Sequence, residues 1–131
     1  MEREKGDVLH SNAMEAKHFI LFLKGHDDTF FIGAMVTHSA EYKNVKNILM
    51  DKEHFCTQDS EGNDYKFLFD KTYMVPATLL KPMEWQPFTK VGQLTDQGVD
   101  FVESNIGHMI PKLWKDYLAL GGRYESAIII K

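Results

Sequence analysis

Five side chains that can transfer a proton or supply a positive charge lie at the ends of two apolar stretches of the chain. Lys17 and His18 come directly before the first stretch, and Thr37, His38 and Ser39 follow the second. Histidine suits general acid and general base catalysis because its pKa lies near neutrality. A lysine supplies positive charge where a transition state becomes anionic. If the two stretches pair as a hairpin, the five residues meet at one end and provide a base, an acid and a cation.

The histidines also have a simpler interpretation. His18 and His38 suit the ends of strands, where a ring nitrogen forms a hydrogen bond and takes no part in chemistry. Both interpretations require the neighbouring stretches to be strands that meet at this end of the hairpin. The sequence therefore leaves two alternatives open, a reactive cluster and a set of hydrogen-bonded strand ends.

The two stretches have the composition of paired strands. A strand is expected at residues 17–23, and its residues 19–23 are apolar on both alternating faces, which is typical of a strand buried on both sides. Residues 25–28 read Gly-His-Asp-Asp and predict a turn, and residues 29–36 form the next apolar run. The sequence therefore predicts a β-hairpin. Gly33 within the second strand indicates a bulge or a close approach of backbones.

The remaining strands are shorter and less regular. Pro76 interrupts the stretch 73–80, so we expect an edge strand or a bulge there. Further strands are expected at residues 7–10, 48–50, 89–94 and 127–130.

The C-terminal part of the chain predicts helices. Thr95 is a good N-cap, and apolar residues follow it at helical spacing. Pro111 is poorly tolerated inside a helix, so we expect two helices, over 96–106 and 109–120, or one kinked helix. Together with the strands, this pattern predicts a mostly β fold with one or two C-terminal helices.

Composition limits the classes of function. The 131 residues, taken as one domain spanning 1–131, suffice for an independent core. The net charge is -4, and no segment is basic, so a broad positive face for nucleic acid is not supported. Cys56 is the single cysteine, which excludes an internal disulfide and fits a reducing cytosol. All apolar runs are far shorter than the roughly 20 residues of a membrane span, so we expect a cytoplasmic protein without membrane contact.

No metal site is expected. His54 and Cys56 are two candidate ligands without a second pair, and packing in the core is the favoured role of the segment that they flank. Residues 59–64 lack the spacing and the closing glutamate of a calcium loop. We therefore expect neither a metal nor a cofactor.

Four short motifs occur in an order that is typical of one protein family. Residues 6–8 (Gly-Asp-Val) open the first strand, and residues 17–22 follow a polar loop. Residues 36–39 (Val-Thr-His-Ser) end the hairpin, and residues 92–95 (Gly-Gln-Leu-Thr) lead directly into the helix. In this order the chain resembles the PemK/MazF family of toxin ribonucleases over roughly residues 6–106. That family shares an SH3-like barrel with the gyrase-poisoning toxin CcdB.

The resemblance implies a small SH3-like β-barrel closed by one or two C-terminal helices. It also implies a toxin of a toxin–antitoxin pair that cleaves single-stranded RNA through the 2′-OH, without a metal. Lys17 or His18 stands where the family has an arginine and would contact the scissile phosphate, with assistance from Thr37, His38 and Ser39. The implied partners are an antitoxin protein, single-stranded RNA and a second copy of the chain, because the family's toxins pair through their barrels.

Binding without catalysis is the alternative function. The acidic net charge and the missing arginine favour a barrel that grips a protein target, as CcdB does. An exposed apolar patch near Trp85 or Trp114 would support this class. A barrel that binds RNA without cleaving it is a further alternative, and it predicts an affinity that falls steeply with salt.

Overall fold

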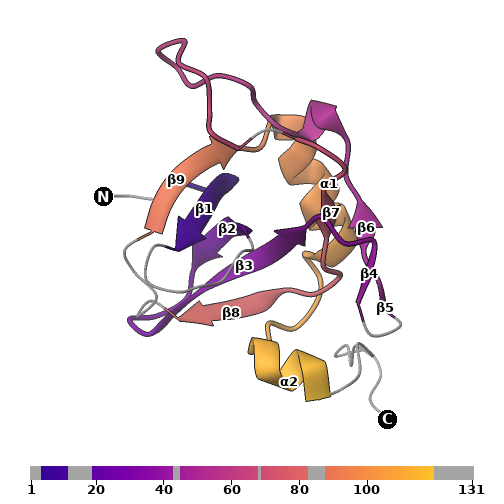
Figure 1. The fold of residues 1–131 in the computed structure, drawn as a ribbon. Helices are drawn as coiled ribbons and strands as arrows, with labels where there is room; N and C mark the ends of the chain where they lie inside the picture. The colour runs from indigo at the N-terminus through magenta and orange to yellow at the C-terminus, as the bar shows by residue number, and fades with distance from the viewer. Residues whose placement is uncertain (1–3, 12–18, 43–44, 68, 83–87, 120–131) are drawn as a thin grey trace.

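One antiparallel sheet dominates the computed structural model, which describes residues 4–11, 19–42, 45–67, 69–82 and 88–119. Its strands lie in the order β6, β7, β3, β2, β1 and β9, and β8 also pairs with β3 (Figure 1). A separate short hairpin joins β4 to β5. The strands are β1 (Asp7–Ser11), β2 (Phe19–Gly25), β3 (Phe30–Thr37), β4 (Glu41–Tyr42), β5 (Val45–Lys46), β6 (Ile48–Leu49), β7 (Tyr73–Met74), β8 (Leu79–Pro82) and β9 (Phe88–Gln93).

The hairpin of β2 and β3 forms as the sequence predicts. Phe19 pairs with Val36 at its open end, and the register shifts within β2 just beyond Phe22. This irregularity lies opposite Gly33, so the predicted bulge is present on the partner strand. A Cβ on Gly33 would come within 2.6 Å of the carbonyl oxygen of Leu21. The glycine therefore permits the close approach of two backbones.

Pro76 divides the stretch that the sequence treats as one strand. β7 and β8 lie on either side of it, and both pair with β3. The N–H of Val75 donates to the carbonyl of Met35 (2.9 Å), and the N–H of Ala77 donates to the carbonyl of Val75 (2.8 Å). The chain thus makes a tight turn around a residue that has no N–H to offer the ladder.

The outer edge of β9 is covered by the segment that connects β6 to β7. The N–H of Phe67 donates to the carbonyl of Val91, and the N–H of Cys56 donates to the carbonyl of Gln93, both at 2.8 Å. Among the described residues, no strand pair joins β6 to β9, the two ends of the sheet order. The mostly β class with a C-terminal helix is confirmed, whereas the described strands alone do not close a ring.

Helix α1 (Asp96–Ile106) has the bounds that the sequence predicts. The hydroxyl of Thr95 accepts from the N–H of Gly98 (3.1 Å) and donates to the carbonyl of Glu53 (2.8 Å). Thr95 is therefore the N-cap, and it also ties the helix to the 3₁₀ turn η1 (Lys52–His54).

Helix α2 (Trp114–Ala119) is shorter than the predicted 109–120. The N–H of Lys112 donates to the carbonyl of Thr78 (3.0 Å), and the N–H of Leu80 donates to the carbonyl of Lys112 (2.8 Å). Backbone groups that bind the edge of β8 are not available to a helix, so α2 begins only after this contact. None of the described helices combines the length and the apolar character needed to span a membrane.

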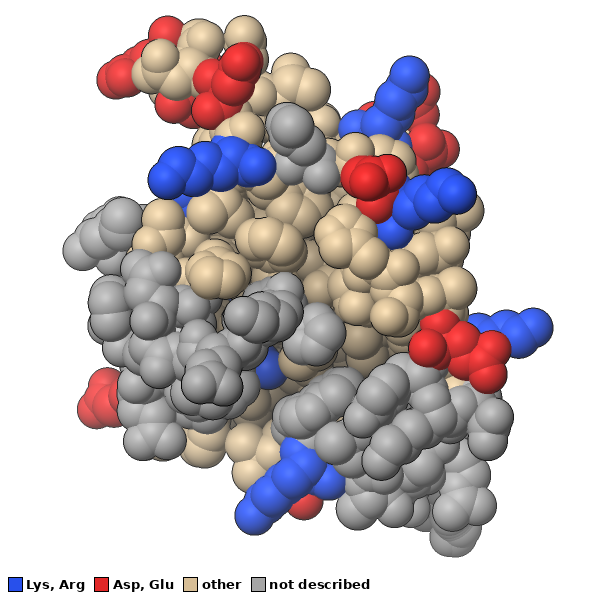
Figure 2. All heavy atoms as spheres, viewed as in Figure 1, with Lys and Arg blue, Asp and Glu red and all other residues tan. Residues whose placement is uncertain are grey.

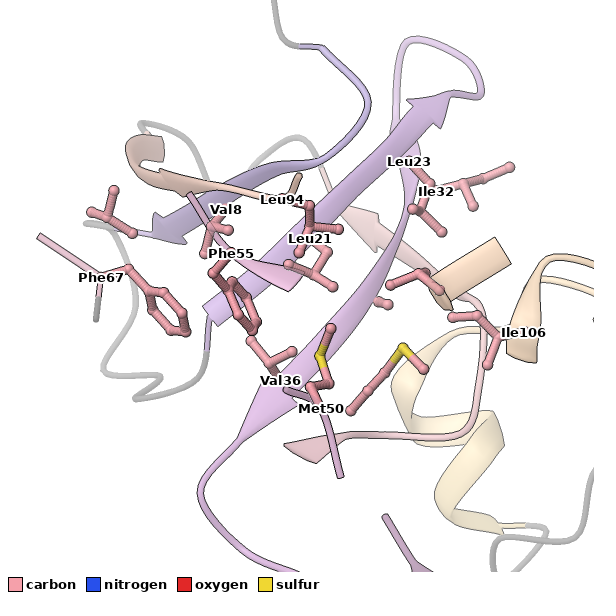
Figure 3. Packing of buried hydrophobic residues seen from close by; sticks show 14 residues of the cluster. Val8, Leu21, Leu23, Ile32, Val36, Met50, Phe55, Phe67, Leu94 and Ile106 are labelled. Carbon is pink, nitrogen blue, oxygen red and sulfur yellow. The ribbon is translucent and has the colours of Figure 1, made fainter. Parts of the chain in front are cut away.

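Alternation along the strands creates two apolar layers. The larger core lies between the sheet and α1, from which it takes Val102 and Ile106. In Figure 3, Phe55 and Phe67 lie at one end of this core and Ile106 at the other. The opposite face of the sheet carries a second cluster, formed by Leu9, Ile20, Phe31 and Phe88.

Some predictions fall on parts of the chain that the structure does not describe. These are the strand expected at 127–130, Trp85 and the side chain of Trp114.

Candidate functional site

A pocket opens at the end of the β2–β3 hairpin, where the sequence predicts the reactive cluster. Its volume is about 170 Å³. Part of its wall comes from the end of β3, and the rest comes from β2 and from the segment that precedes β7. The lining residues are Phe19, Val36, Thr37, His38, Ser39, Phe67 and Thr72.

The pocket brings together three of the five predicted site residues, Thr37, His38 and Ser39. Lys17 and His18 lie outside the described residues, so their place at the pocket stays a prediction. The hairpin on which that prediction depends is observed.

His38 is exposed to solvent, and its ring is held by one hydrogen bond. Its Nδ1 lies 3.0 Å from the carbonyl oxygen of Asp70. A carbonyl oxygen can only accept, so Nδ1 carries the proton in this contact. In the neutral ring this leaves Nε2 as the proton acceptor, which is the form that a general base requires.

The turn that holds His38 is itself constrained. Lys71, directly after Asp70, has a φ of 47°, in the left-handed region that a lysine rarely adopts. Thr72 is buried and fixes the turn on its other side, because its carbonyl accepts from the N–H of Met50 (2.9 Å). Strained backbone persists only where surrounding contacts maintain it, and it is frequent at functional sites.

A second set of hydrogen bonds orders the loop after β3. The N–H of Ser39 donates to the hydroxyl of Thr37 (3.3 Å), and the side-chain amide of Asn47 donates to the carbonyl of Ser39 (2.9 Å). The Thr37 hydroxyl still has its own proton to donate and a second lone pair. The rim of the pocket therefore presents an ordered hydroxyl beside an oriented imidazole.

The interior of the pocket is apolar. The rings of Phe19 and Phe67 meet edge to face with centroids 5.0 Å apart, and Phe67 packs in turn on Phe55 (5.0 Å). The sequence did not assign Phe67 or Thr72 to the site, because no motif connects their segment to the hairpin. The hydrogen bond from Phe67 to β9 and the turn before β7 bring this segment to the pocket.

Among the described residues, positively charged side chains do not form a patch on the face shown in Figure 2. In Figure 2 the lysines stand apart from one another, and acidic side chains gather on the projecting loop that carries Asp59, Glu61 and Asp64. Lys90 is engaged by the buried Asp7, with Nζ 3.1 Å from the carboxylate. Burial opposes the charge on Lys90, but the hydrogen bond and the charge of Asp7 outweigh it and raise the lysine's pKa.

No group of three or more metal-ligating side chains occurs within the described ranges. Comparison of the chain with protein-family models, with curated proteins and with solved structures finds no match in any of the three.

Proposed function

We propose that this protein is a toxin-like endoribonuclease that cleaves single-stranded RNA without a metal. The observation that carries the proposal is the pocket in which His38 stands with Nδ1 donating to the carbonyl of Asp70 and Nε2 left to accept a proton. Thr37 and Ser39 line the same pocket, which supports the proposal, and the predicted approach of Lys17 and His18 to these residues stays a prediction.

In the proposed reaction, Nε2 of His38 takes the proton of a ribose 2′-OH. The 2′ oxygen then attacks the adjacent phosphorus, and the bond from phosphorus to the 5′ oxygen of the next nucleotide breaks. The leaving oxygen receives a proton from an acid, so the products are a 2′,3′-cyclic phosphate and a 5′-OH end. General acid–base catalysis of this kind contributes roughly 10² to 10⁴ in rate for each group.

The acid and the cation are assigned from the sequence. His18 is the candidate acid, and Lys17 is the candidate cation for the charge that develops on the phosphate. Lys71 is a second candidate cation, because it belongs to the turn that holds His38.

The proposal is tested with a long single-stranded RNA in the presence of EDTA. We expect the wild-type chain to cut the RNA and His38→Ala to lose at least about 10² in rate. His108→Ala is the matched control, because His108 is exposed and lies outside the pocket, after α1. RNA that stays intact at an excess of protein, or equal cutting by His38→Ala, would overturn the proposal.

The assignment to a toxin–antitoxin pair rests on the resemblance to the PemK/MazF family. It predicts an antitoxin gene beside the gene for this chain, and relief of the chain's toxicity when both are expressed. Expression of the chain alone in bacteria, with and without the neighbouring gene product, tests this part separately from the chemistry.

A module that binds a protein partner is the second candidate. Leu49 is 58% exposed on β6, the strand at one end of the sheet order, and Ile110 is 42% exposed. Exposed large apolar side chains at a sheet edge favour contact with another chain. This candidate gains support if RNA stays intact and Leu49→Lys abolishes binding to a copurifying protein.

A further inference from the structure

The pocket at the end of β3 has the composition of a binding site for a small molecule. Val36 is fully buried and Phe67 nearly so, and Phe19 adds a partly exposed ring. Thr37 and Ser39, which carry hydroxyl groups, also line the pocket. Ligand pockets are typically apolar inside, with a few placed polar groups that fix the orientation of the ligand.

The volume restricts what can enter. At about 170 Å³, this pocket is smaller than those that hold drug-sized ligands, which measure roughly 300–1,000 Å³. It suits one planar ring and excludes a whole nucleotide. An aromatic side chain such as Phe19 binds such a ring by stacking, as in proteins that recognise unpaired bases.

The Thr37 hydroxyl is a polar group that can pair with a base in this pocket. It accepts from the N–H of Ser39, so it keeps one proton to donate and one lone pair with which to accept. A ring nitrogen of cytosine accepts at the position where uracil presents an N–H. A hydroxyl that does both therefore suits either pyrimidine.

We propose that this pocket holds one pyrimidine base of the RNA, on the nucleotide whose 2′-OH loses its proton to His38. The proposal rests on the ribonuclease function proposed above. The base and the ribose of one nucleotide are joined covalently, so a base seated against Phe19 brings its own 2′-OH to the rim that His38 lines. The chain then cuts preferentially after uridine and cytidine, because a cavity of about 150 Å³ holds one six-membered ring and the fused rings of a purine fit this pocket less well.

Binding of single nucleotides tests the pocket without any turnover. The 3′-monophosphates of uridine, cytidine and adenosine are titrated into the full chain at one fixed salt concentration, and heat is measured. We expect both pyrimidine nucleotides to bind about tenfold more tightly than the adenosine nucleotide. This difference in affinity lies within the range that stacking of one base on an aromatic side chain contributes.

Two variants assign that binding to the pocket. Phe19→Leu should weaken the binding of both pyrimidine nucleotides about tenfold. Phe22→Leu is its matched control on the same strand, because Phe22 packs against the cluster on the opposite face of the sheet. Thr37→Val keeps the side-chain volume and removes the hydroxyl, so it should weaken the binding of both pyrimidine nucleotides, which tests the pocket even if Phe19→Leu does not fold.

The outcomes separate this inference from the proposed function. If pyrimidine nucleotides bind as expected and RNA stays intact, the base pocket is supported and the ribonuclease proposal fails. If RNA is cut equally after all four bases, the base pocket is overturned and the ribonuclease proposal stands. Nucleotide binding without a preference for pyrimidines, or affinities unchanged in both Phe19→Leu and Thr37→Val, also overturns the base pocket.

Discussion

The orientation and tautomer of the His38 ring depend on a backbone group far away in sequence. The carbonyl of Asp70 sets the tautomer of the ring, and the direction of that carbonyl depends on the conformation of the next residue, Lys71. A lysine with a φ of 47° has a backbone conformation that costs roughly 1–2 kcal/mol relative to the ordinary right-handed or extended conformations. The strained residue therefore lies in the turn that orients the candidate general base.

Substitution of Lys71 tests this strain. Glycine has no Cβ and tolerates a positive φ, whereas valine is branched and does not. We expect Lys71→Gly to have a free energy of unfolding about 1–2 kcal/mol higher than Lys71→Val, measured by urea titration. The same pair of changes at Lys66, an exposed residue whose φ is not positive, is the control and should show no such advantage for glycine. Equal stability of the two Lys71 variants would contradict the strained turn.

Lys81 on β8 is fully buried, and burial lowers its pKa to about 8. Since the unfolded chain keeps a pKa near 10.5, it binds more protons than the folded chain between these values. The free energy of unfolding therefore rises with pH from about 8 to 10.5, and the buried charge costs most below pH 8.

Removal of the charge should abolish this dependence. Lys81→Met is expected to raise the free energy of unfolding at pH 7 by about 1–3 kcal/mol, and the gain should shrink as the pH approaches 10. Urea titrations of both chains at pH 7, 8.5 and 10 measure the difference. A difference that stays constant across this range would show that the lysine does not titrate as its burial implies.

At the scale of elements, β3 is the strand that organises the site. It pairs with β2, β7 and β8. These pairings fix the position of the pocket residue that β2 contributes relative to the turn before β7. The segment between β6 and β7, which contains η1, is held from the opposite side by β9 and by Thr95 at the start of α1. The pocket therefore depends on packing between α1 and η1 as well as on the sheet.

Gly98 lies in close contact with η1. A Cβ on this residue would collide with the carbonyl of His54, whose ring stacks on Phe101 at 4.2 Å. We expect Gly98→Ala to lower the melting temperature and to cost about 1–3 kcal/mol, although alanine is the better helix former. Gln97→Ala, on the exposed face of the same turn, is the control and should be neutral or slightly stabilising. Stabilisation by Gly98→Ala would contradict this packing.

The sequence predicts those elements that local signals determine. Alternating apolar residues around a Gly-Asp turn predict the β2–β3 hairpin, and Thr95 predicts the start of α1. Pro76 predicts the irregularity that separates β7 from β8. The length of α2 is not predictable in this way, because Lys112 is drawn into contact with β8 by the tertiary structure.

The candidate site likewise contains residues that local sequence signals identify and residues that only tertiary contacts add. Thr37, His38 and Ser39 are found from the sequence because they are contiguous at the end of one strand. Phe67 and Thr72 join them through long-range hydrogen bonds and turn geometry. The turn at Lys71 has no sequence signal, since glycine and asparagine are the residues that normally mark a positive φ.

At the scale of the whole molecule, the charge distribution bears on how RNA would bind. The net charge is -4, and the described lysines are scattered on the face shown in Figure 2. On this face few phosphates can be neutralised at once, so RNA bound there would depend on local contacts with a base and one phosphate. This favours an enzyme that reads a short single-stranded site over a protein that coats long RNA.

The most direct test of the ribonuclease proposal uses a DNA oligonucleotide that contains one uridine ribonucleotide, in the presence of EDTA. The proposed chemistry needs a 2′-OH, so we predict a single cut directly 3′ of that uridine, with a 2′,3′-cyclic phosphate on one product. His38→Ala should leave the oligonucleotide whole. Cutting at deoxyribonucleotides, or no cut at an excess of wild-type protein, would contradict the proposal.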